Sequence, residues 1–137
     1  MSELSAEQIG QLLAAAQEAS ERAYAPFSNF CVGAAILTQS GEMFTGCNVE
    51  NSSYGLTNCA ERTAIFSAVA AGALSAERAL VAVAVVHRHG AACSPCGACR
   101  QVIFEFGPEA VVIFRPQMGE LAEMKARELL PNGFRLR

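Results

Sequence analysis

The sequence has few charged residues, no cluster of basic residues and no long apolar run. Charged residues make up 17% of its 137 residues, and the formal net charge is −3. Without a basic run, the molecule has no field that would attract nucleic acid. No apolar stretch reaches the roughly 18 residues that suggest a membrane span, and the first residues lack the pattern of a signal peptide. These absences predict a cytoplasmic protein with a small-molecule partner, binding neither nucleic acid nor membrane.

Six cysteines stand in the chain beside only two histidines. In a protein that is not secreted, cysteines are more often thiols or metal ligands than parts of a disulfide framework. Hydrophobic residues make up 52% of the sequence, which is enough for a sizeable core. The length fits one domain covering residues 1–137, and the apolar content predicts that some surface is hidden in an oligomer.

Hydrophobic periodicity switches between helical and extended patterns along the chain. Ser5 and Gln8 form a capping box before apolar residues at helical spacing, which predicts a first helix. Residues 120–130 fit either a helix or an edge strand ending near Lys125 before one short helix. The other expected elements are a helix ending near residue 23, strands at 31–38 and 43–49, a helix at 59–71, a strand at 80–86, a helix at 96–106 and a strand at 110–114. Their order predicts a layered α/β domain.

Three cysteines carry the strongest chemical signal. Cys96 and Cys99 form a C-x-x-C pair after Pro95, at a predicted helix start, so both sulfurs can lie on one side of the first turn. Cys59 stands at another predicted helix start, where the positive end of the helix favours the thiolate that zinc binds. We expect these three residues to hold one zinc ion per chain, with the fourth tetrahedral position open for water, as in catalytic zinc sites.

Glu61 and Arg62, which follow Cys59 closely in the chain, have predicted roles beside the metal. Glu61 is close enough to hydrogen-bond the water and carry its proton to a substrate nitrogen. Three thiolates around Zn²⁺ leave a net negative charge, which weakens the ion as a Lewis acid. We expect Arg62 to offset this charge by donating a hydrogen bond to one thiolate. An ordinary surface salt bridge is the alternative interpretation of Arg62.

Three other interpretations of the cysteines remain. In the first interpretation, all six cysteines are reduced residues of the core. In the second, Cys93 is the fourth ligand of a closed structural zinc site, although Pro95 would then lie inside the ligand cluster and Glu61 would have no task. The third is an iron–sulfur site, but the bacterial spacing needs a cysteine where this chain has Ile103.

The remaining cysteines and both histidines receive no role in the predicted site. His87 and His89 flank a loop and are expected to face solvent. Cys31 and Cys47 lie in predicted hairpin strands and are expected in the core. No function is assigned to the run His87-Arg-His-Gly90.

The motif Cys59-Ala-Glu61, followed by Pro95-Cys-x-x-Cys99, resembles the zinc deaminases, whose pattern is H-x-E…P-C-x-x-C. With cysteine in the first position and a short length, the chain resembles the small homotetrameric cytidine deaminases. The resemblance runs in order through nearly the whole chain. Its segments are Tyr24-Ala-Pro-Phe-Ser-Asn-Phe30, Val32-Gly-Ala34, Gly46-Cys-Asn-Val-Glu-Asn51, Cys59-Ala-Glu-Arg-Thr-Ala64, Ser94-Pro-Cys-Gly-Ala-Cys-Arg-Gln101 and Glu128-Leu-Leu-Pro131.

This resemblance implies a three-layer cytidine-deaminase-like domain, with a central mixed sheet of about five strands and helices on both faces. It also implies a cytoplasmic homotetramer that hydrolyses cytidine and 2′-deoxycytidine to the uridine products in pyrimidine salvage. Attack at C4 would be assisted by Glu61, which protonates N3 and then the departing amine. A deaminase of another aminopyrimidine, of the blasticidin S type, and a non-catalytic zinc-stabilised binding module are the alternatives.

The resemblance further implies how a nucleoside is held. Asn48 and Glu50 bind the ribose 3′-hydroxyl, and Phe30 lines the pocket. The backbone N–H of Ala60 donates to the base carbonyl, while the carbonyl of Ser94 accepts from the exocyclic amine.

Two aromatic residues are matched to contacts between subunits. Phe134 corresponds to a C-terminal aromatic residue that reaches the active site of a neighbouring subunit. Tyr54 is expected near a subunit contact.

Overall fold

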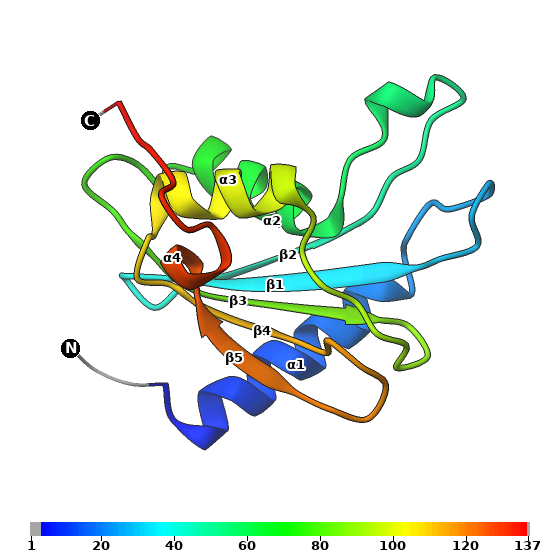
Figure 1. Ribbon diagram of the computed structural model, residues 1–137, viewed down its shortest axis with the longest axis horizontal. Helices are drawn as coiled ribbons and strands as arrows, with labels where there is room; N and C mark the ends of the chain where they lie inside the picture. The colour runs from blue at the N-terminus through cyan, green and yellow to red at the C-terminus, as the bar shows by residue number, and fades with distance from the viewer. Residues whose placement is uncertain (1–3, 137) are drawn as a thin grey trace.

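The structure is a computed structural model that describes residues 4–136. Five strands form a mixed sheet in the order β2-β1-β3-β4-β5. Helix α1 lies on one face of the sheet, and α2, α3 and α4 lie on the other (Figure 1). In chain order the elements are α1 (Ala6–Ser20), β1 (Val32–Thr38), β2 (Met43–Cys47), a 3-10 turn (Tyr54–Leu56), α2 (Ala60–Ala70), β3 (Leu80–His87), α3 (Gly97–Phe106), β4 (Val111–Phe114), β5 (Ala122–Lys125) and α4 (Ala126–Leu129). The predicted three-layer α/β architecture is confirmed.

Two apolar layers join the helices to the sheet. Successive residues of a strand point to opposite faces, so Ile36 of β1 packs among the residues under α2 and α3, whereas Leu37 packs against α1. Strands β1 and β3 are buried along nearly their whole length, which explains why β3 reads as a continuous apolar run. Full burial of each valine, leucine or isoleucine in these strands contributes about 1.5–3 kcal/mol.

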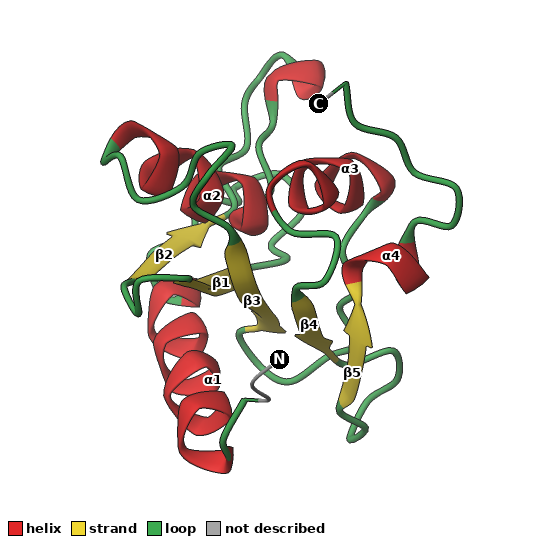
Figure 2. Ribbon diagram, turned by 90° about the vertical axis from the view of Figure 1, so that its left-hand side faces the viewer, coloured by secondary structure: helices red, strands yellow, loops and turns green. Residues whose placement is uncertain are grey.

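Chain direction brings the N-termini of α2 and α3 to the same end of the sheet. Strands β3 and β4 pair in parallel, and α3 forms the crossover between them, starting beyond the carboxyl end of β3. Helix α2 immediately precedes β3 and runs in the opposite direction, so it starts at the same end. The two helices lie next to each other above the sheet (Figure 2). The predicted metal ligands stand at these two helix starts.

Two predicted boundaries are wrong by two or three residues for a common reason. The first helix ends at Ser20 rather than near residue 23, and the second strand ends at Cys47 rather than at residue 49. Both chain segments leave their elements to pair with each other, through an isolated bridge between Tyr24 and Val49. For residues 120–130 the alternative of an edge strand ending at Lys125 before a short helix is confirmed.

Three predictions of burial are also wrong. Cys31 and Cys47 are half-buried rather than part of the core, because they lie at the outer ends of the hairpin. The thiol of Cys47 donates to the carbonyl of Arg22 over 3.5 Å. His87 is half-buried instead of facing solvent, whereas His89 is exposed as predicted.

Replacing Gly46 by alanine should destabilise the protein. An added Cβ would lie 2.5 Å from the amide nitrogen of Ala64 and 2.7 Å from the carbonyl oxygen of Ala60. Both atoms belong to the backbone of α2, which would have to move, and overpacking of this kind costs about 1–3 kcal/mol. Gly10→Ala is the control, since nothing lies within 4 Å of a Cβ there and alanine should stabilise an exposed helix by about 1 kcal/mol. Equal urea midpoints for the two variants would contradict this tight packing.

Candidate functional site

Three sulfur atoms meet where α2 and α3 begin. Cys59 is the N-cap of α2, Cys96 is the N-cap of α3, and Cys99 lies in the first turn of α3. Their Sγ atoms all lie within 4.8 Å of one another, and those of Cys59 and Cys96 are 3.8 Å apart. Two sulfurs bound tetrahedrally to zinc at about 2.3 Å lie about 3.8 Å apart. The donor set and its spacing therefore fit a zinc ion.

The Cys59 thiol ionises more readily than an ordinary cysteine. A hydrogen bond from the Cys99 thiol and another from the Arg62 guanidinium lower the pKa of Cys59 to about 5, although burial opposes the shift. The pKa of Cys99 is raised in turn, because its proton is held by Cys59 and because it is buried. A thiolate is the form that binds zinc.

Arg62 contacts the sulfur cluster directly. Its Nη2 donates to the Sγ of Cys59 over 3.2 Å, and this contact raises the pKa of Arg62. The Nε of Arg62 is buried and has no hydrogen-bond partner among the described residues. Through the contact with Cys59, the guanidinium places its positive charge beside a sulfur of the predicted metal site, as the predicted offset of three thiolates requires.

Glu61 lies inside the protein in the first turn of α2. Only 3% of its surface is exposed, and burial raises its pKa to about 7, with the neighbouring Cys59 charge acting in the same direction. A carboxyl group with a pKa near neutrality can both accept and donate a proton. Its place two residues after Cys59 puts this group beside the sulfur cluster.

Cys93 does not join the cluster. Among the described residues, which include all six cysteines, the only group of three or more His, Cys, Asp or Glu side chains spaced for one metal is that of Cys59, Cys96 and Cys99. Cys93 is packed in the apolar layer between the sheet and the helices, and burial raises its pKa to about 12. Its backbone N–H donates to the carbonyl of Arg115 over 2.8 Å. This geometry disfavours Cys93 as a fourth ligand.

Glu50 fastens the loop that follows α1. Its Oε1 accepts from the backbone N–H groups of Phe27 and Ser28, over 2.9 and 3.2 Å, and its Oε2 accepts from the Ser28 hydroxyl. The Ser28 hydroxyl bond is the main reason that the pKa of Glu50 is lowered. These residues, with Tyr54 and Thr57, line a hollow of about 410 Å³.

Asn48 holds the next part of the same loop. Its Nδ2 donates to the carbonyl of Phe30 over 2.8 Å, and its Oδ1 accepts from the N–H of Val32 over 2.9 Å. An amide side chain has two N–H donors and two acceptor lone pairs. One donor and one acceptor therefore remain for a ligand hydroxyl, so the loop contacts leave room for the predicted ribose contact.

The other residues of the predicted pocket come from three segments. Phe30 is 41% exposed, and its ring lies against that of His87, with centroids 4.3 Å apart. Ala60 is buried at the first position of α2, where a backbone N–H has no partner within the helix. Ser94 is exposed between Cys93 and the buried Pro95.

Phe134 and Tyr54 have largely exposed rings. Phe134 is 66% exposed and Tyr54 is 74% exposed. The carbonyl of Phe134 accepts from Gln101 of α3 over 3.3 Å, while the ring of Tyr54 meets that of Phe27 edge to face at 5.7 Å. Rings this exposed are free to meet another subunit, as the resemblance implies.

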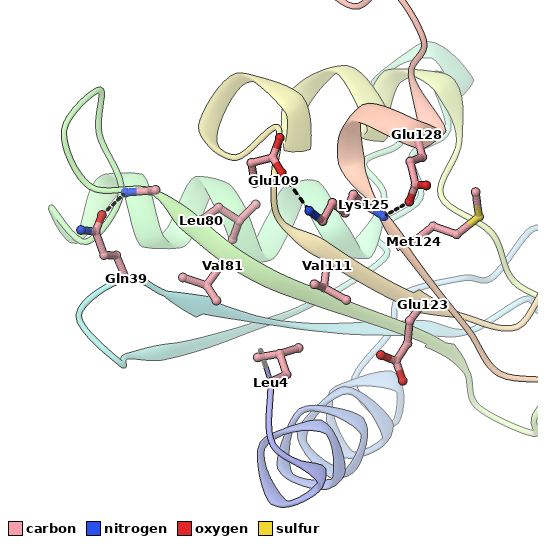
Figure 3. A pocket seen from close by; sticks show the side chains of 11 residues that line it. Leu4, Gln39, Leu80, Val81, Glu109, Val111, Glu123, Met124, Lys125 and Glu128 are labelled. Atoms are coloured by element: carbon pink, nitrogen blue, oxygen red, sulfur yellow. Dashed lines mark hydrogen bonds and ion pairs between the residues drawn. The ribbon is translucent and has the colours of Figure 1, made fainter. Parts of the chain in front are cut away.

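A larger hollow, of about 920 Å³, lies elsewhere on the sheet. Figure 3 shows that its walls come from β3, β4, β5 and Leu4, with Lys125 paired to Glu109. Its lining contains none of the predicted site residues and includes Leu80 and Val111, the first residues of β3 and β4. The cysteines follow the opposite end of β3, so this hollow is separate from the sulfur cluster.

Ser28, which contacts Glu50, and His87, which contacts Phe30, have no role predicted from the sequence. Ser28 belongs to one of the matched motifs, but nothing in the spacing connects it with Glu50, 22 residues later. His87 was expected in solvent because it flanks a glycine-containing loop. Only the pairing of β1 with β3, which sets Val32 opposite His87, brings it near Phe30.

Known proteins resemble the chain along most of its length. A family model described as the cytidine and deoxycytidylate deaminase zinc-binding region matches residues 6–115. A cytidine deaminase of Sporosarcina psychrophila is 45% identical over 92% of this chain and 90% of its own length. One from Halalkalibacterium halodurans is 46% identical over 90% of this chain and 91% of its own. The crystal structure of cytidine deaminase from Burkholderia pseudomallei superimposes with a TM-score of 0.83 at 49% identity, covering 96% and 100% of the two chains.

Replacing Cys96 by alanine should remove bound metal, whereas Cys93→Ala should leave about one metal ion per chain. The difference is expected because the Sγ of Cys96 lies in the sulfur cluster and Cys93 lies in the apolar layer. Elemental analysis after dialysis against a weak chelator measures the metal, and circular dichroism checks that both variants fold. If folded Cys93→Ala loses its metal, the result would instead support the closed structural site in which Cys93 is the fourth ligand.

Proposed function

The chain belongs to the cytidine and deoxycytidylate deaminase family, and we propose that it hydrolyses cytidine and 2′-deoxycytidine to uridine and 2′-deoxyuridine with release of ammonia, in pyrimidine salvage. The observation that carries this proposal is the cluster of three sulfurs with the buried Glu61 two residues after one of them. We further propose that the whole chain, residues 1–137, is one catalytic domain.

In this proposal Cys59, Cys96 and Cys99 hold one zinc ion, in agreement with the sulfur spacing described above. Bound zinc supplies a water molecule acidified for attack on C4 of the pyrimidine. Arg62, donating to Cys59, draws negative charge from that sulfur so that three thiolates do not cancel the charge of the ion.

Glu61 moves the protons. Its carboxylate takes a proton from the attacking water and delivers it to N3 of the base, which makes C4 more electrophilic. The same carboxylate then takes the proton of the new C4 hydroxyl and passes it to the exocyclic nitrogen, so that a C4 carbonyl forms, the C4–N bond breaks and ammonia departs. Burial raises the pKa of Glu61 and keeps bulk water from competing for the proton, while the charge of the zinc ion would act on this pKa in the opposite direction.

The remaining groups orient the nucleoside. The N–H of Ala60, at the positive end of α2, donates to the carbonyl oxygen of the base, and the carbonyl of Ser94 accepts from the exocyclic amine. Phe30 contacts the nucleoside with its ring. The free donor of Asn48 and the carboxylate of Glu50 bind the ribose 3′-hydroxyl.

A homotetramer with active sites at subunit contacts completes the proposal. Exposed aromatic and apolar side chains are consistent with it, among them Tyr54, Leu56 and Phe134, each at least 66% exposed. Large exposed apolar residues that gather on a surface mark interaction sites. In this arrangement Phe134 closes the pocket of a neighbouring subunit.

Glu61→Gln should lower kcat for cytidine by about 10²–10⁴-fold while leaving the zinc content unchanged, since the amide cannot carry a proton but has nearly the same shape. The loss of ultraviolet absorbance of cytidine follows the reaction. Glu120→Gln, on an exposed residue, is the control and should match wild type. Near-normal turnover by Glu61→Gln would refute the proton transfer. If the zinc-loaded wild type leaves cytidine unchanged, cytidine is not the substrate. The alternatives would then be a deaminase of the blasticidin S type or a non-catalytic zinc-stabilised binding module.

Sedimentation velocity should give four times the 14.5 kDa mass of one chain. Hybrid tetramers of Glu61→Gln with Phe134→Ala should be more active than the average of the two variants alone, because some sites then combine an intact Glu61 with a neighbour's Phe134. Activity equal to that average would show that Phe134 does not serve a neighbouring site, and an active monomer would contradict shared sites altogether.

A further inference from the structure

The run His87-Arg-His-Gly90 starts at the last residue of β3 and forms the loop that leads to the segment carrying Ser94 and Cys96. This loop is fastened to two other parts of the chain. The N–H of Arg88 donates to the carbonyl of Cys31 over 2.9 Å, and the guanidinium of Arg88 pairs with Glu21 at 2.7 Å. From α1, the side chain of Gln17 donates to the carbonyl of Arg88 over 2.7 Å. The loop is therefore held in a defined place beside the segment that carries Phe30.

The side chain of His87 links this loop to the predicted pocket. Its Nδ1 accepts from the backbone N–H of His89 over 3.0 Å and from that of Ala91 over 3.4 Å. One face of its ring meets Phe30, with centroids 4.3 Å apart and planes inclined by 44°. The imidazole thus holds the start of the loop and packs against the pocket aromatic at the same time.

The hydrogen bonds define the chemical form of His87. A nitrogen that accepts two N–H groups carries no proton, so the ring is neutral with its proton on Nε2. Burial and the neighbouring His89 lower the pKa of His87 below its ordinary value, which favours the same form. Arg88, the other charged group of the loop, is turned to Glu21.

We propose that His87 is a positioning residue for nucleoside binding, whose ring holds that of Phe30 in place while its Nδ1 fixes the loop leading to Ser94. This inference rests on the proposed function, because the role of Phe30 as a pocket wall comes from it. Among the described residues, His87 makes no hydrogen bond to the sulfur cluster or to Glu61. Its loss should therefore weaken substrate binding more than the chemical step.

Two substitutions separate the two contacts of His87. His87→Asn keeps a side-chain acceptor for the loop but removes the ring, whereas His87→Phe keeps a ring against Phe30 but removes the acceptor. His87→Asn should raise KM for cytidine by about 2- to 12-fold, the range expected for loss of an aromatic pair, with kcat changed by less than about twofold. His87→Phe should recover most of the KM, and the control Glu120→Gln, on an exposed residue outside this loop, should match wild type.

A double-mutant cycle with Phe30 distinguishes positioning from a general structural effect. In a Phe30→Leu background, His87→Asn should raise KM no further, because the ring that it supported is already gone. Additive effects, an unchanged KM in His87→Asn, or losses in kcat that follow the melting temperature would each overturn the proposal. If His87→Asn fails to fold, His87→Leu, which also removes the ring that contacts Phe30, takes its place in the same cycle with the same expected and contradicting results.

Nitrogen NMR of histidine-labelled protein gives a readout that does not need catalysis. His87 should show an unprotonated Nδ1 and a protonated Nε2, and binding of uridine measured by calorimetry should weaken in His87→Asn by the same factor as KM rises. A wild type that binds uridine but does not deaminate cytidine would refute the proposed function alone. A protonated Nδ1, or uridine affinity unchanged in His87→Asn, would refute the role of His87 alone.

Discussion

The site depends on bringing three sulfurs together at two helix N-termini without an excess of negative charge. Each helix start contributes a partial positive charge that favours a nearby anion by about 0.3–1 kcal/mol in exposed settings and by more when partly buried. Arg62 adds a full charge through its contact with Cys59. The three sulfurs meet only if α2 and α3 start close together, so α2 has to be held in a fixed place on the sheet. Gly46 of β2 contributes to this, because the absence of a side chain lets the backbone of α2 pack directly against that of β2.

Much of this arrangement was predictable because local signals and chemistry agree. The apolar run that became β3 could only be a strand covered on both faces, and Pro95 before Cys96 marked the start of α3. The C-x-x-C spacing after Pro95 paired Cys96 with Cys99, and the place of Cys59 at another predicted helix start added it as the third ligand. The edge strand β5 could not be separated from a helix, because its four residues carry no distinctive period and its only sheet partner is β4.

The contacts that the sequence could not reveal are those between segments far apart in the chain. From the sequence, Glu50 is either a ribose ligand or a polar residue at a strand end, and nothing in its neighbourhood indicates that it also accepts three hydrogen bonds from residues 27 and 28. His87 was placed in solvent for the same reason. Its partner Phe30 is 57 residues away and reaches it only through the antiparallel pairing of β1 with β3.

These long-range contacts also bear on how the pocket binds. Asn48 and Glu50 use part of their hydrogen-bonding capacity to hold residues 27–32, and only the remainder is left for the proposed contact with a ribose hydroxyl. The wall that carries Phe30 is thus ordered before a nucleoside arrives, so binding does not bear the entropic cost of fixing that loop. Because each of these two side chains would serve both purposes, removing Asn48 or Glu50 would delete the proposed ribose contact and also loosen the wall. Loss of affinity in such variants therefore cannot measure the ribose contact by itself, whereas His87 supports the wall without any predicted contact to the ribose.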